Sequence, residues 1–343
     1  MNSTDVRDLY CGADLHGNNV VLHICDSSGA KVFARRVKTN LHAVLRALEA
    51  FQERLSAIAV ESTFDWYWFV DGLLTAGYDV RLANPAKMEQ YDGLKVTDDE
   101  SDAAWLAEML RLGILPESYI YPEQIRSLRD ALRRRQLFMR QYTQTLLSLE
   151  SLLARYGKEH ASLSEIENWT LPDIRALDLD DFARLQVSTL AESLRKSRAL
   201  AKQIEVKAFE RVKPTESFER IHQVPGIGKI LGMTIALEAG DFGRFPSAGD
   251  YASYCRTVKS ERGSNKKKKG RNNAKNGNRY LAWAYIEAAT FAVRYYPPIK
   301  TWYERKKRRR NVAVAKKALA CKLAKATWHV MSGKEFEMDM LFK

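Results

Sequence analysis

Four acidic residues in the first third of the chain have types and spacing that suit a metal-dependent site. Asp14 and Glu61 each follow a short apolar run of strand type, and Asp99 and Asp102 are three residues apart in a helical pattern. Residues three apart share one face of a helix. Carboxylates that converge without partners repel one another, and a divalent cation relieves that repulsion. Any one of these acids, taken alone, could instead be a helix N-cap or a turn residue.

A second candidate is a serine in the basic segment 260–278. This segment reads Ser-Glu-Arg-Gly-Ser-Asn-Lys-Lys-Lys-Lys-Gly-Arg-Asn-Asn-Ala-Lys-Asn-Gly-Asn, and its serines are Ser260 and Ser264. A serine hydroxyl is a weak nucleophile that needs a base or a metal ion, and a phosphodiester under attack needs positive charge around it. Lys and Arg are rarely buried without partners, so the segment faces solvent or a polyanion. A solvated basic loop and a nucleophile loop with a phosphate cradle both fit this segment.

The positive charge of the chain is concentrated around this segment. The net charge is +13, and residues 256–310 hold 18 Lys or Arg against three Glu, whereas the rest of the chain holds 37 basic and 39 acidic residues. This asymmetry favours nucleic acid, because neutralised phosphates release counterions and so supply affinity. The expected phosphate contacts are Lys266, Lys267, Lys268, Lys269, Arg271, Lys275, Arg308, Arg309 and Arg310.

Composition excludes several other kinds of site. The four cysteines lie far apart and the six histidines form no pair at a ligand spacing, so we expect oxygen ligands and a hard ion, Mg²⁺ or Mn²⁺. No Gly-x-x-x-x-Gly-Lys-Ser/Thr loop for a nucleotide is present. Neither a signal peptide nor an apolar run of membrane-spanning length is present, so we expect a cytoplasmic, nucleoid-associated bacterial protein.

The elements that must position the four acids follow the order βββαβαβα. We expect strands at 9–13, 20–24, 31–37, 57–60 and 79–82, and helices at 41–51, 66–76 and 102–112. Three strands joined by tight turns form an antiparallel meander, and the later alternation of helix and strand adds parallel strands. The pattern predicts a mixed α/β sheet covered by helices, with acids at the ends of its strands, where ligands bind.

A heptad pattern follows in the middle of the chain. Its seam positions are Ile125, Leu128, Leu132, Arg135, Met139, Tyr142, Leu146, Leu149, Leu153 and Tyr156, of which nine are apolar. This pattern is typical of a coiled coil or a long helical hairpin, and a weaker helical stretch at 185–212 would be the returning helix. A helix that packs within its own domain is the alternative. We therefore divide the chain into residues 1–115, a helical spacer at 116–213, and residues 214–343.

A Pro-Gly-x-Gly turn opens the last part of the chain. Gly226, Gly228 and Lys229 lie between two helical patterns, as in a helix-hairpin-helix motif. Such glycines let backbone N–H groups approach a phosphate, and the next helix adds its positive end. We expect these residues to contact DNA, with a simple tight turn as the alternative. The helix expected at 278–289 carries an apolar stripe, and we expect the nearby Trp283, Tyr285 and Phe291 to belong to the core.

The acids of the first part resemble the Asp-Glu-Asp-Asp signature of insertion-sequence family one-ten, the DEDD transposases, which include the Piv DNA invertase. The resemblance rests on Gly12-Ala-Asp14-Leu, Val60-Glu61-Ser, Asn84-Pro and Asp99-Glu-Ser-Asp102-Ala. It implies a RuvC-like domain of the ribonuclease H-like fold, in which Asp14, Glu61, Asp99 and Asp102 hold Mg²⁺. Asp98, which directly precedes Asp99, is the alternative third acid.

The resemblance extends to the basic segment. In this family a loop with Ser-Gly, several basic residues and then Lys-x-Gly-Asn supplies a nucleophilic serine. The element Lys275-Asn-Gly-Asn278 points back to Ser264, which is followed by Asn instead of Gly, and Ser260 is the second candidate. The family also implies a coiled-coil linker, a mostly helical transposase domain, a synaptic homotetramer built from dimers, and a bridge RNA that pairs with donor and target DNA.

The sequence therefore predicts a DNA recombinase that cuts and rejoins donor and target strands through a covalent phosphoserine. Two alternatives remain at this point. A metal-dependent, structure-selective nuclease would use the four acids to activate water, and its serines would only touch phosphate. A noncatalytic scaffold would bind RNA or DNA through the basic part alone.

Overall fold

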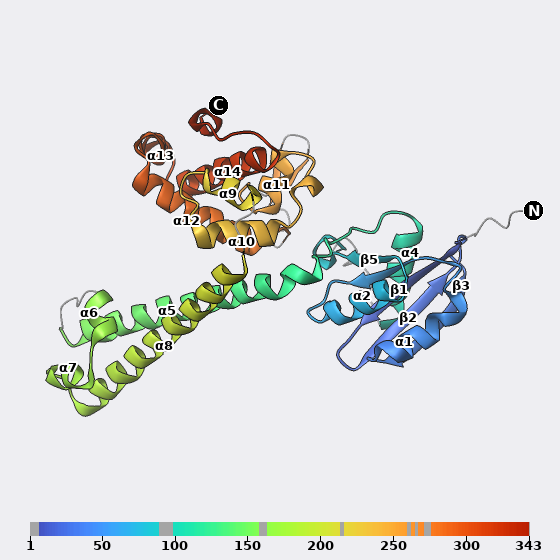
Figure 1. Ribbon diagram of the computed structural model, residues 1–343, viewed down its shortest axis with the longest axis horizontal. Coiled ribbons are helices and arrows are strands. Elements are labelled where there is room, and N and C mark those ends of the chain that lie inside the picture. Colours follow the sequence, from blue (N-terminus) through green and yellow to red (C-terminus); the bar gives the residue numbers. More distant parts are fainter. Residues whose placement is uncertain are drawn as a thin grey trace, which may run out of the picture. The chain divides into compact units, whose positions relative to one another are not determined.

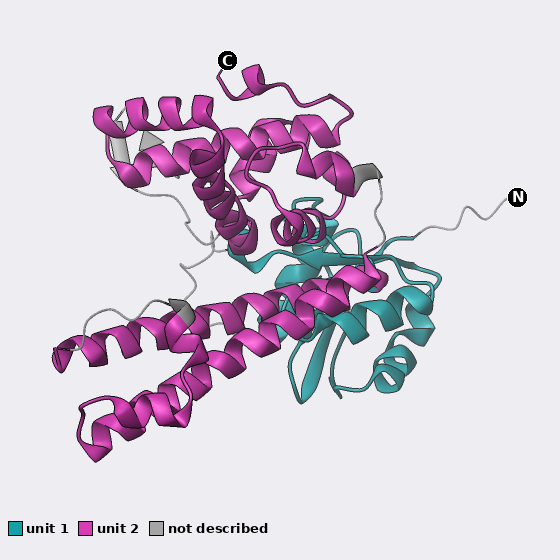
Figure 2. Ribbon diagram, turned by 60° about the vertical axis from the view of Figure 1, so that its left-hand side comes forward, with its two compact units in different colours: residues 1–123 teal, residues 124–343 magenta. Residues whose placement is uncertain are grey.

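The computed structural model describes residues 7–88, 99–157, 163–212, 216–258, 262–264, 267–270 and 276–342. The chain forms two compact units, residues 1–123 and 124–343, which are teal and magenta in Figure 2. No helix within the described ranges is both long enough and apolar enough to cross a membrane.

Unit 1 is built on a five-stranded mixed sheet with the order β3-β2-β1-β4-β5 (Figure 1). Its strands are β1 (Leu9–Leu15), β2 (Asn19–Cys25), β3 (Lys31–Lys38), β4 (Leu55–Glu61) and β5 (Val80–Ala83). The first three strands form an antiparallel meander, and β4 and β5 run parallel to β1. The predicted mixed sheet is confirmed. Because β1 and β4 extend beyond their apolar runs, Asp14 and Glu61 lie inside strands, not after them.

Helices cover both faces of this sheet. They are α1 (Leu41–Leu48), the short 3-10 helix η1 (Glu49–Phe51), α2 (Trp66–Thr75), α3 (Pro85–Met88) and α4 (Asp99–Arg111). α1 and α2 share an apolar core with one face of the sheet, to which Ile58 and Leu82 contribute. α4 crosses the opposite face, where Leu106 and Met109 pack on Ala59. α4 begins at Asp99, three residues earlier than predicted, so that its first turn includes Asp102.

Gly12 sets how closely α4 approaches the sheet. A Cβ atom at this position would lie 1.9 Å from the carbonyl oxygen of Ala103 and 2.7 Å from the backbone nitrogen of Ala107. Real Cβ atoms do not approach backbone this closely, so only glycine lets α4 lie in its place against β1. The first turn of α4 is thereby carried over the end of β1 that holds Asp14.

The described residues of unit 2 form helices and one short hairpin. Its elements are α5 (Glu123–Arg155), α6 (Leu163–Asn168), α7 (Leu171–Ala176), α8 (Asp181–Arg211), α9 (Glu216–His222), α10 (Lys229–Ala239), η3 (Phe242–Arg244), α11 (Ala248–Tyr254), β6 (Arg262–Ser264), β7 (Lys267–Gly270), α12 (Arg279–Tyr295), α13 (Pro297–Arg309), α14 (Val312–Met331) and η4 (Met338–Leu341). α5 and α8 are 33 and 31 residues long and lie side by side (Figures 1 and 2). Leu149 and Leu153 of the heptad seam pack against Val187 and Leu194 of α8, whereas Tyr156 lies beyond the end of α5.

The rest of unit 2 packs around α12. The predicted stripe of Leu281, Ala284, Tyr285 and Ala288 is fully buried. Trp283 is half-buried, but Phe291 is 39% exposed, so the expectation that it belongs to the core was wrong. The buried stripe continues at Ala292, the next position along the helix, which turns Phe291 toward the surface.

The basic segment contains an antiparallel hairpin where we predicted a loop. β6 and β7 pair, and Ser264 at the end of β6 is opposite Lys267. The segment lacks the apolar alternation that predicts strands, so this hairpin was not predictable from its residue pattern. Several predicted residues lie outside the described ranges: Asp98, Ser260, Lys266, Arg271 and Lys275.

Candidate metal centre and nucleic-acid interface

The strand alternation places two of the four acids on the face that α4 covers. Successive residues of a strand point to opposite faces, so Asp14 shares its face with Gly12, against which α4 packs. Glu61 likewise shares its face with Ala59, which packs against α4. In the parallel ladder, Ala13 pairs with the residue that precedes Glu61. The two carboxylates therefore lie on adjacent strands beneath the first turn of α4.

The same register brings a basic residue into this row from the edge of the sheet. Asp14 pairs with Val21 of β2, and Val21 pairs with Arg36 of β3. The guanidinium Nη1 of Arg36 lies 2.9 Å from Oδ2 of Asp99. Arg36 thus links β3 to the start of α4.

His16 lies between two of the acids. Its Nε2 is 2.8 Å from Oδ2 of Asp14 and 3.4 Å from Oδ1 of Asp99. One donor atom from each of these three residues lies within 4.8 Å of the others, which is a spacing that one metal ion can bridge. Asp14 is almost fully buried, whereas the other two are partly exposed.

Electrostatic coupling connects all four predicted acids. Burial raises the pKa of Asp14, His16 lowers it, and the negative charges of Asp102 and Asp99 raise it further. Burial also raises the pKa of Glu61, and the charges of Asp14 and Asp102 add to that increase. The fold therefore gathers negative charge that it does not fully neutralise. A divalent cation offsets such charge, and carboxylate oxygens are ligands that hard divalent cations bind.

Sequence reasoning missed His16 and Arg36. We expected oxygen ligands alone because no two histidines have a ligand spacing. The spacing of Asp14 and His16, two apart at the end of a strand, was a signal that both side chains point the same way. The pairing of Arg36 with Asp99 depends on the register of three strands, which is not visible in local sequence.

The Pro-Gly-x-Gly turn lies between α9 and α10, as the sequence predicted. Gly226 has φ of +81°, and a Cβ atom there would lie 2.1 Å from the carbonyl oxygen of Ala288, so the turn packs tightly on α12. Gly228 is the N-cap of α10 and offers no side chain to its first N–H groups. These N–H groups, together with Lys229, form a positive helix end of the kind that binds phosphate.

This turn lines a groove of about 820 Å³ in unit 2. Lys229 and Arg140 contribute positive charge to its lining, and Arg135, which also lines it, is paired with Glu205. Phe291 and Tyr295 form a stacked pair on α12, with ring centroids 6.4 Å apart and an interplanar angle of 6°. Exposed rings beside cations are typical of surfaces that bind single-stranded nucleic acid.

Comparisons with known proteins match both parts of the chain. A model of the DEDD transposases of IS110, described as "Transposase", matches residues 11–158, and a model described as "Transposase IS116/IS110/IS902 family" matches residues 218–304. A curated protein named "Putative transposase y4qE", from Sinorhizobium fredii (strain NBRC 101917 / NGR234), is 22% identical over 303 residues, which cover 86% of this chain and 74% of that protein. The chain belongs to the IS110 family of transposases.

Membership of the family gives the acid cluster a context. The first matched region contains Asp14, Glu61, Asp99 and Asp102. Its DEDD type implies divalent metal use, and the transposase family implies DNA as a partner. The second matched region contains the Pro-Gly-x-Gly turn and the hairpin with Ser264.

The other predicted phosphate contacts within the described residues lie at two places in unit 2. Lys267, Lys268 and Lys269 belong to β7. Arg308 and Arg309 end α13, and Arg310 directly follows; all three are exposed. Positive charge in the last turn of a helix is favourable because it faces the negative end of the helix dipole.

Proposed function

We propose that this transposase cuts and rejoins DNA strands with Ser264 as nucleophile and divalent ions at Asp14, Glu61, Asp99 and Asp102. The observation that carries the proposal is the convergence of four mutually repelling acids at one end of the sheet, of which Asp14 is buried and Glu61 is half-buried. A divalent ion held by these carboxylates would supply Lewis acidity toward the phosphodiester oxygens. His16 lies within reach of the same ion and joins the proposed ligands.

The proposed step conserves the energy of the phosphodiester. Ser264 Oγ loses its proton and attacks phosphorus, so that a serine–phosphate ester bond forms as one bond from phosphorus to a DNA oxygen breaks. The released DNA oxygen takes up a proton. A hydroxyl from another strand then attacks the same phosphorus and releases serine, which rejoins the strands without nucleotide hydrolysis.

Ser264 is preferred to Ser260 because of its position in the segment. It ends β6, where its backbone pairs with that of Lys267, the first of the lysines of β7. Phosphate bound by these lysines would be held close to the backbone of Ser264. Lys266, Lys268, Lys269, Arg271 and Lys275 complete the proposed phosphate cradle.

The turn with Gly226, Gly228 and Lys229 is proposed to act as a helix-hairpin-helix contact to the nucleic-acid backbone. Its support is the uncapped N-terminus of α10 within a groove that also contains stacked aromatic rings. Arg308, Arg309 and Arg310 are proposed to position further phosphates, without selecting a base sequence.

The long helices are proposed to assemble protomers as a coiled coil. In this arrangement residues 1–115 carry the acids, 116–213 form the linker and 214–343 carry the serine. Two dimers would form the synaptic tetramer, and a bridge RNA would select donor and target DNA by base pairing. Support comes from the pairing of α5 with α8 and from the membership of the IS110 family.

A denaturing gel tests the proposed chemistry. Purified protein is mixed with end-labelled donor and target DNA, the noncoding RNA adjacent to its gene, and Mg²⁺. We expect a labelled protein–DNA adduct with the wild type and with Ser260→Ala, and none with Ser264→Ala. Full strand exchange by Ser264→Ala would refute the serine step, and cleaved DNA without any adduct would favour the metal-dependent nuclease.

The same gel distinguishes the proposed recombinase from the noncatalytic scaffold. If the acids do chemistry, Asp14→Asn yields neither adduct nor cleaved strand, although it still binds DNA. Undiminished products from Asp14→Asn would eliminate the proposed metal site.

A further inference from the structure

A buried carboxylate in unit 2 lies outside the proposed catalytic residues. Glu238, near the end of α10, has a relative exposure of only 2%. Burying a charge costs on the order of several kcal/mol per ion unless hydrogen-bonded or oppositely charged partners compensate. Its partners therefore indicate what the charge does.

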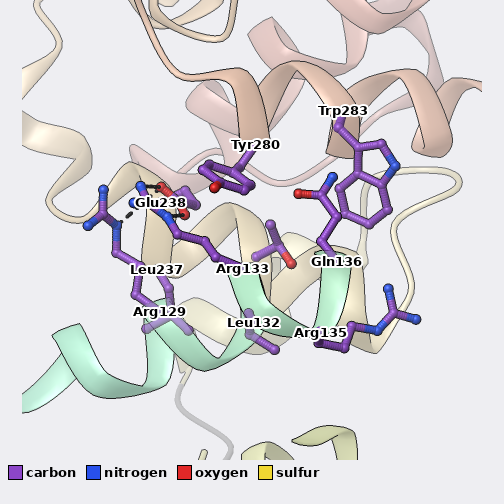
Figure 3. Close-up of a pocket in the computed structure, with 10 residues that line it drawn as sticks. Arg129, Leu132, Arg133, Arg135, Gln136, Leu237, Glu238, Tyr280 and Trp283 are labelled. Atoms are coloured by element: carbon purple, nitrogen blue, oxygen red, sulfur yellow. Dashed lines mark hydrogen bonds and ion pairs between the residues drawn. The ribbon is translucent and has the colours of Figure 1, made fainter. Parts of the chain in front are cut away.

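Two arginines of α5 neutralise Glu238. Arg133 Nε lies 2.5 Å from Oε1 and its Nη2 lies 2.8 Å from Oε2, which is a bidentate pair, and Arg129 Nε lies 3.1 Å from Oε2. In Figure 3 both arginine side chains extend from α5 to Glu238, with the Tyr280 ring of α12 beside them. The Arg133 guanidinium lies 4.4 Å from the centre of that ring. Burial alone would raise the pKa of Glu238, but Arg133, Arg129 and Asn278 hold it below its ordinary value.

A further partner of Glu238 is Asn278, the last residue of the Lys-Asn-Gly-Asn element. Asn278 Nδ2 donates to Oε2 of Glu238 at 2.7 Å, and Asn278 Oδ1 accepts from the N–H groups of Tyr280 and Leu281 at the start of α12. Within the described ranges, the other N-cap residues whose side chains cap a helix are exposed: Asn40, Asp180, Asp241, Ser247 and Asn311. Capping by itself needs neither burial nor a carboxylate, so Asn278 has a second role.

The backbone around Asn278 closes the base of the segment that contains β6 and β7. Asn278 N–H donates to the carbonyl of Tyr254 at 2.6 Å, and Arg256 Nε donates to the carbonyl of Gly277 at 3.0 Å. Gly277 has φ of +88°, and a Cβ atom there would lie 2.5 Å from the Tyr254 oxygen. Arg256 has φ of +55°, which is costly for a residue with a side chain and persists only where surrounding contacts enforce it. The residues that precede the segment, 254–256, and those that follow it, 277–278, are thus held together.

We propose that Glu238 is a positioning residue for strand exchange: through Asn278 it fixes the base of the β6–β7 segment, and through Arg129 and Arg133 it ties that base to α5. The activity side of this inference rests on the proposed function, because Ser264 lies in that segment. The structural part of the inference does not depend on the proposed function. The contacts that link α5 through Glu238 to Asn278 all involve described residues outside the hairpin. A shift of α5 would be transmitted to the hairpin through one buried carboxylate.

The test compares the same substitution at two helix N-caps. Asn278→Ser keeps a side chain that caps helices well but removes the amide that reaches Glu238. Asn311→Ser makes the matched change at the N-cap of α14, where Asn311 Oδ1 accepts from Val314 N–H outside the Glu238 cluster. Hydrogen exchange of peptides that cover 262–270, the rate of adduct formation, DNA affinity and thermal melting are measured for the full-length proteins.

We expect Asn278→Ser to speed hydrogen exchange in the hairpin and to slow adduct formation about 10- to 100-fold, since small misplacements of reacting groups cost about that much. DNA affinity should stay within about twofold, and Asn311→Ser should behave as wild type. Unchanged hydrogen exchange in Asn278→Ser, or an equal rate loss in Asn311→Ser, overturns the proposal.

A swapped pair provides the rescue. Asn278→Asp alone sets two carboxylates against each other, whereas Glu238→Gln with Asn278→Asp restores a donor and an acceptor and keeps the helix cap. We expect the double variant to recover hairpin protection and adduct formation relative to Asn278→Asp, and no recovery would count against the link. If Ser264→Ala still forms the adduct, the proposed function fails, but the hydrogen-exchange comparison still decides whether Glu238 fixes the hairpin.

Discussion

At the scale of single residues, the site depends on charges that the fold places close together. Asp14 is buried beside Glu61, and the pKa of each is raised by burial and by neighbouring negative charge. His16 and Arg36 each approach Asp99, so they neutralise only part of the cluster. Metal binding should therefore stabilise unit 1 by removing repulsion among these groups.

Asp14→Asn should abolish the stabilisation that Mg²⁺ gives. A ligand that binds only the folded state adds about 2.7 kcal/mol at one hundred times its Kd. Thermal melts of the wild type with and without Mg²⁺ should differ, and those of Asp14→Asn should coincide. Asp79→Asn, at an exposed carboxylate paired with Arg81, is the matched control and should keep the Mg²⁺ effect. Equal Mg²⁺ shifts in the wild type and Asp14→Asn would contradict the metal assignment.

Glu238→Gln should destabilise the protein in a pH-dependent way. The folded-state pKa of Glu238 is lowered, so its contribution is present above the unfolded pKa and is lost as pH falls through the folded value. Breaking one partner of a buried ion pair costs on the order of 3 kcal/mol. Denaturant melts should show this difference at pH 7 and a shrinking difference in acid. A difference that stays constant down to strongly acidic pH would show that Glu238 is not ionised in the folded protein.

At the scale of elements, α4 and the strand register together assemble the acid cluster. Gly12 allows α4 to lie against β1, and α4 begins at Asp99, at the edge of the cluster. The order and type of these elements were predictable, because apolar runs and turn residues mark the strands. The extra length of β1 and β4 was not, because strand pairing continues through Asp14 and Glu61 although both are polar.

Gly12→Ala should destabilise unit 1 and weaken Mg²⁺ binding together. The new Cβ would meet backbone atoms of α4 at 1.9 Å, and overpacking of this kind costs about 3 kcal/mol. Gly17→Ala is the control, because no atom lies within 4 Å of the Cβ it would add. Urea melts and Mg²⁺ titrations of both variants provide the measurement. Wild-type stability of Gly12→Ala would mean that α4 does not pack on β1 in this way.

Lys229→Ala should weaken DNA binding by about the same factor for different sequences. A lysine that contacts only phosphate carries no sequence information, and its loss lowers the slope of log K against log salt by about 1. Lys207→Ala removes an exposed lysine that pairs with Glu210 on α8 and should leave that slope unchanged. Fluorescence anisotropy at several salt concentrations measures both. A loss confined to one DNA sequence would contradict backbone contact at this turn.

At the scale of the whole molecule, the sequence predicted the fold of each part of the chain better than the long-range contacts within it. The mixed sheet, the helical remainder and the family were all predictable from patterns and motifs. The β6–β7 hairpin was not, because its strands lack apolar alternation. Glu238 gave no signal either, since a glutamate within a helix usually faces solvent, and its arginines lie more than one hundred residues earlier in the chain. Contacts of that separation depend on how the helices of unit 2 pack.

The most direct test of the central claim is to locate the DNA on the trapped protein. The adduct is isolated from a reaction with Mg²⁺, its DNA is digested to the attached nucleotide, and the peptides are sequenced by mass spectrometry. We predict a nucleotide on Ser264 in the wild type and no modified peptide from Asp14→Asn. A nucleotide on any other residue, or modification that persists in Asp14→Asn, would contradict the proposed mechanism.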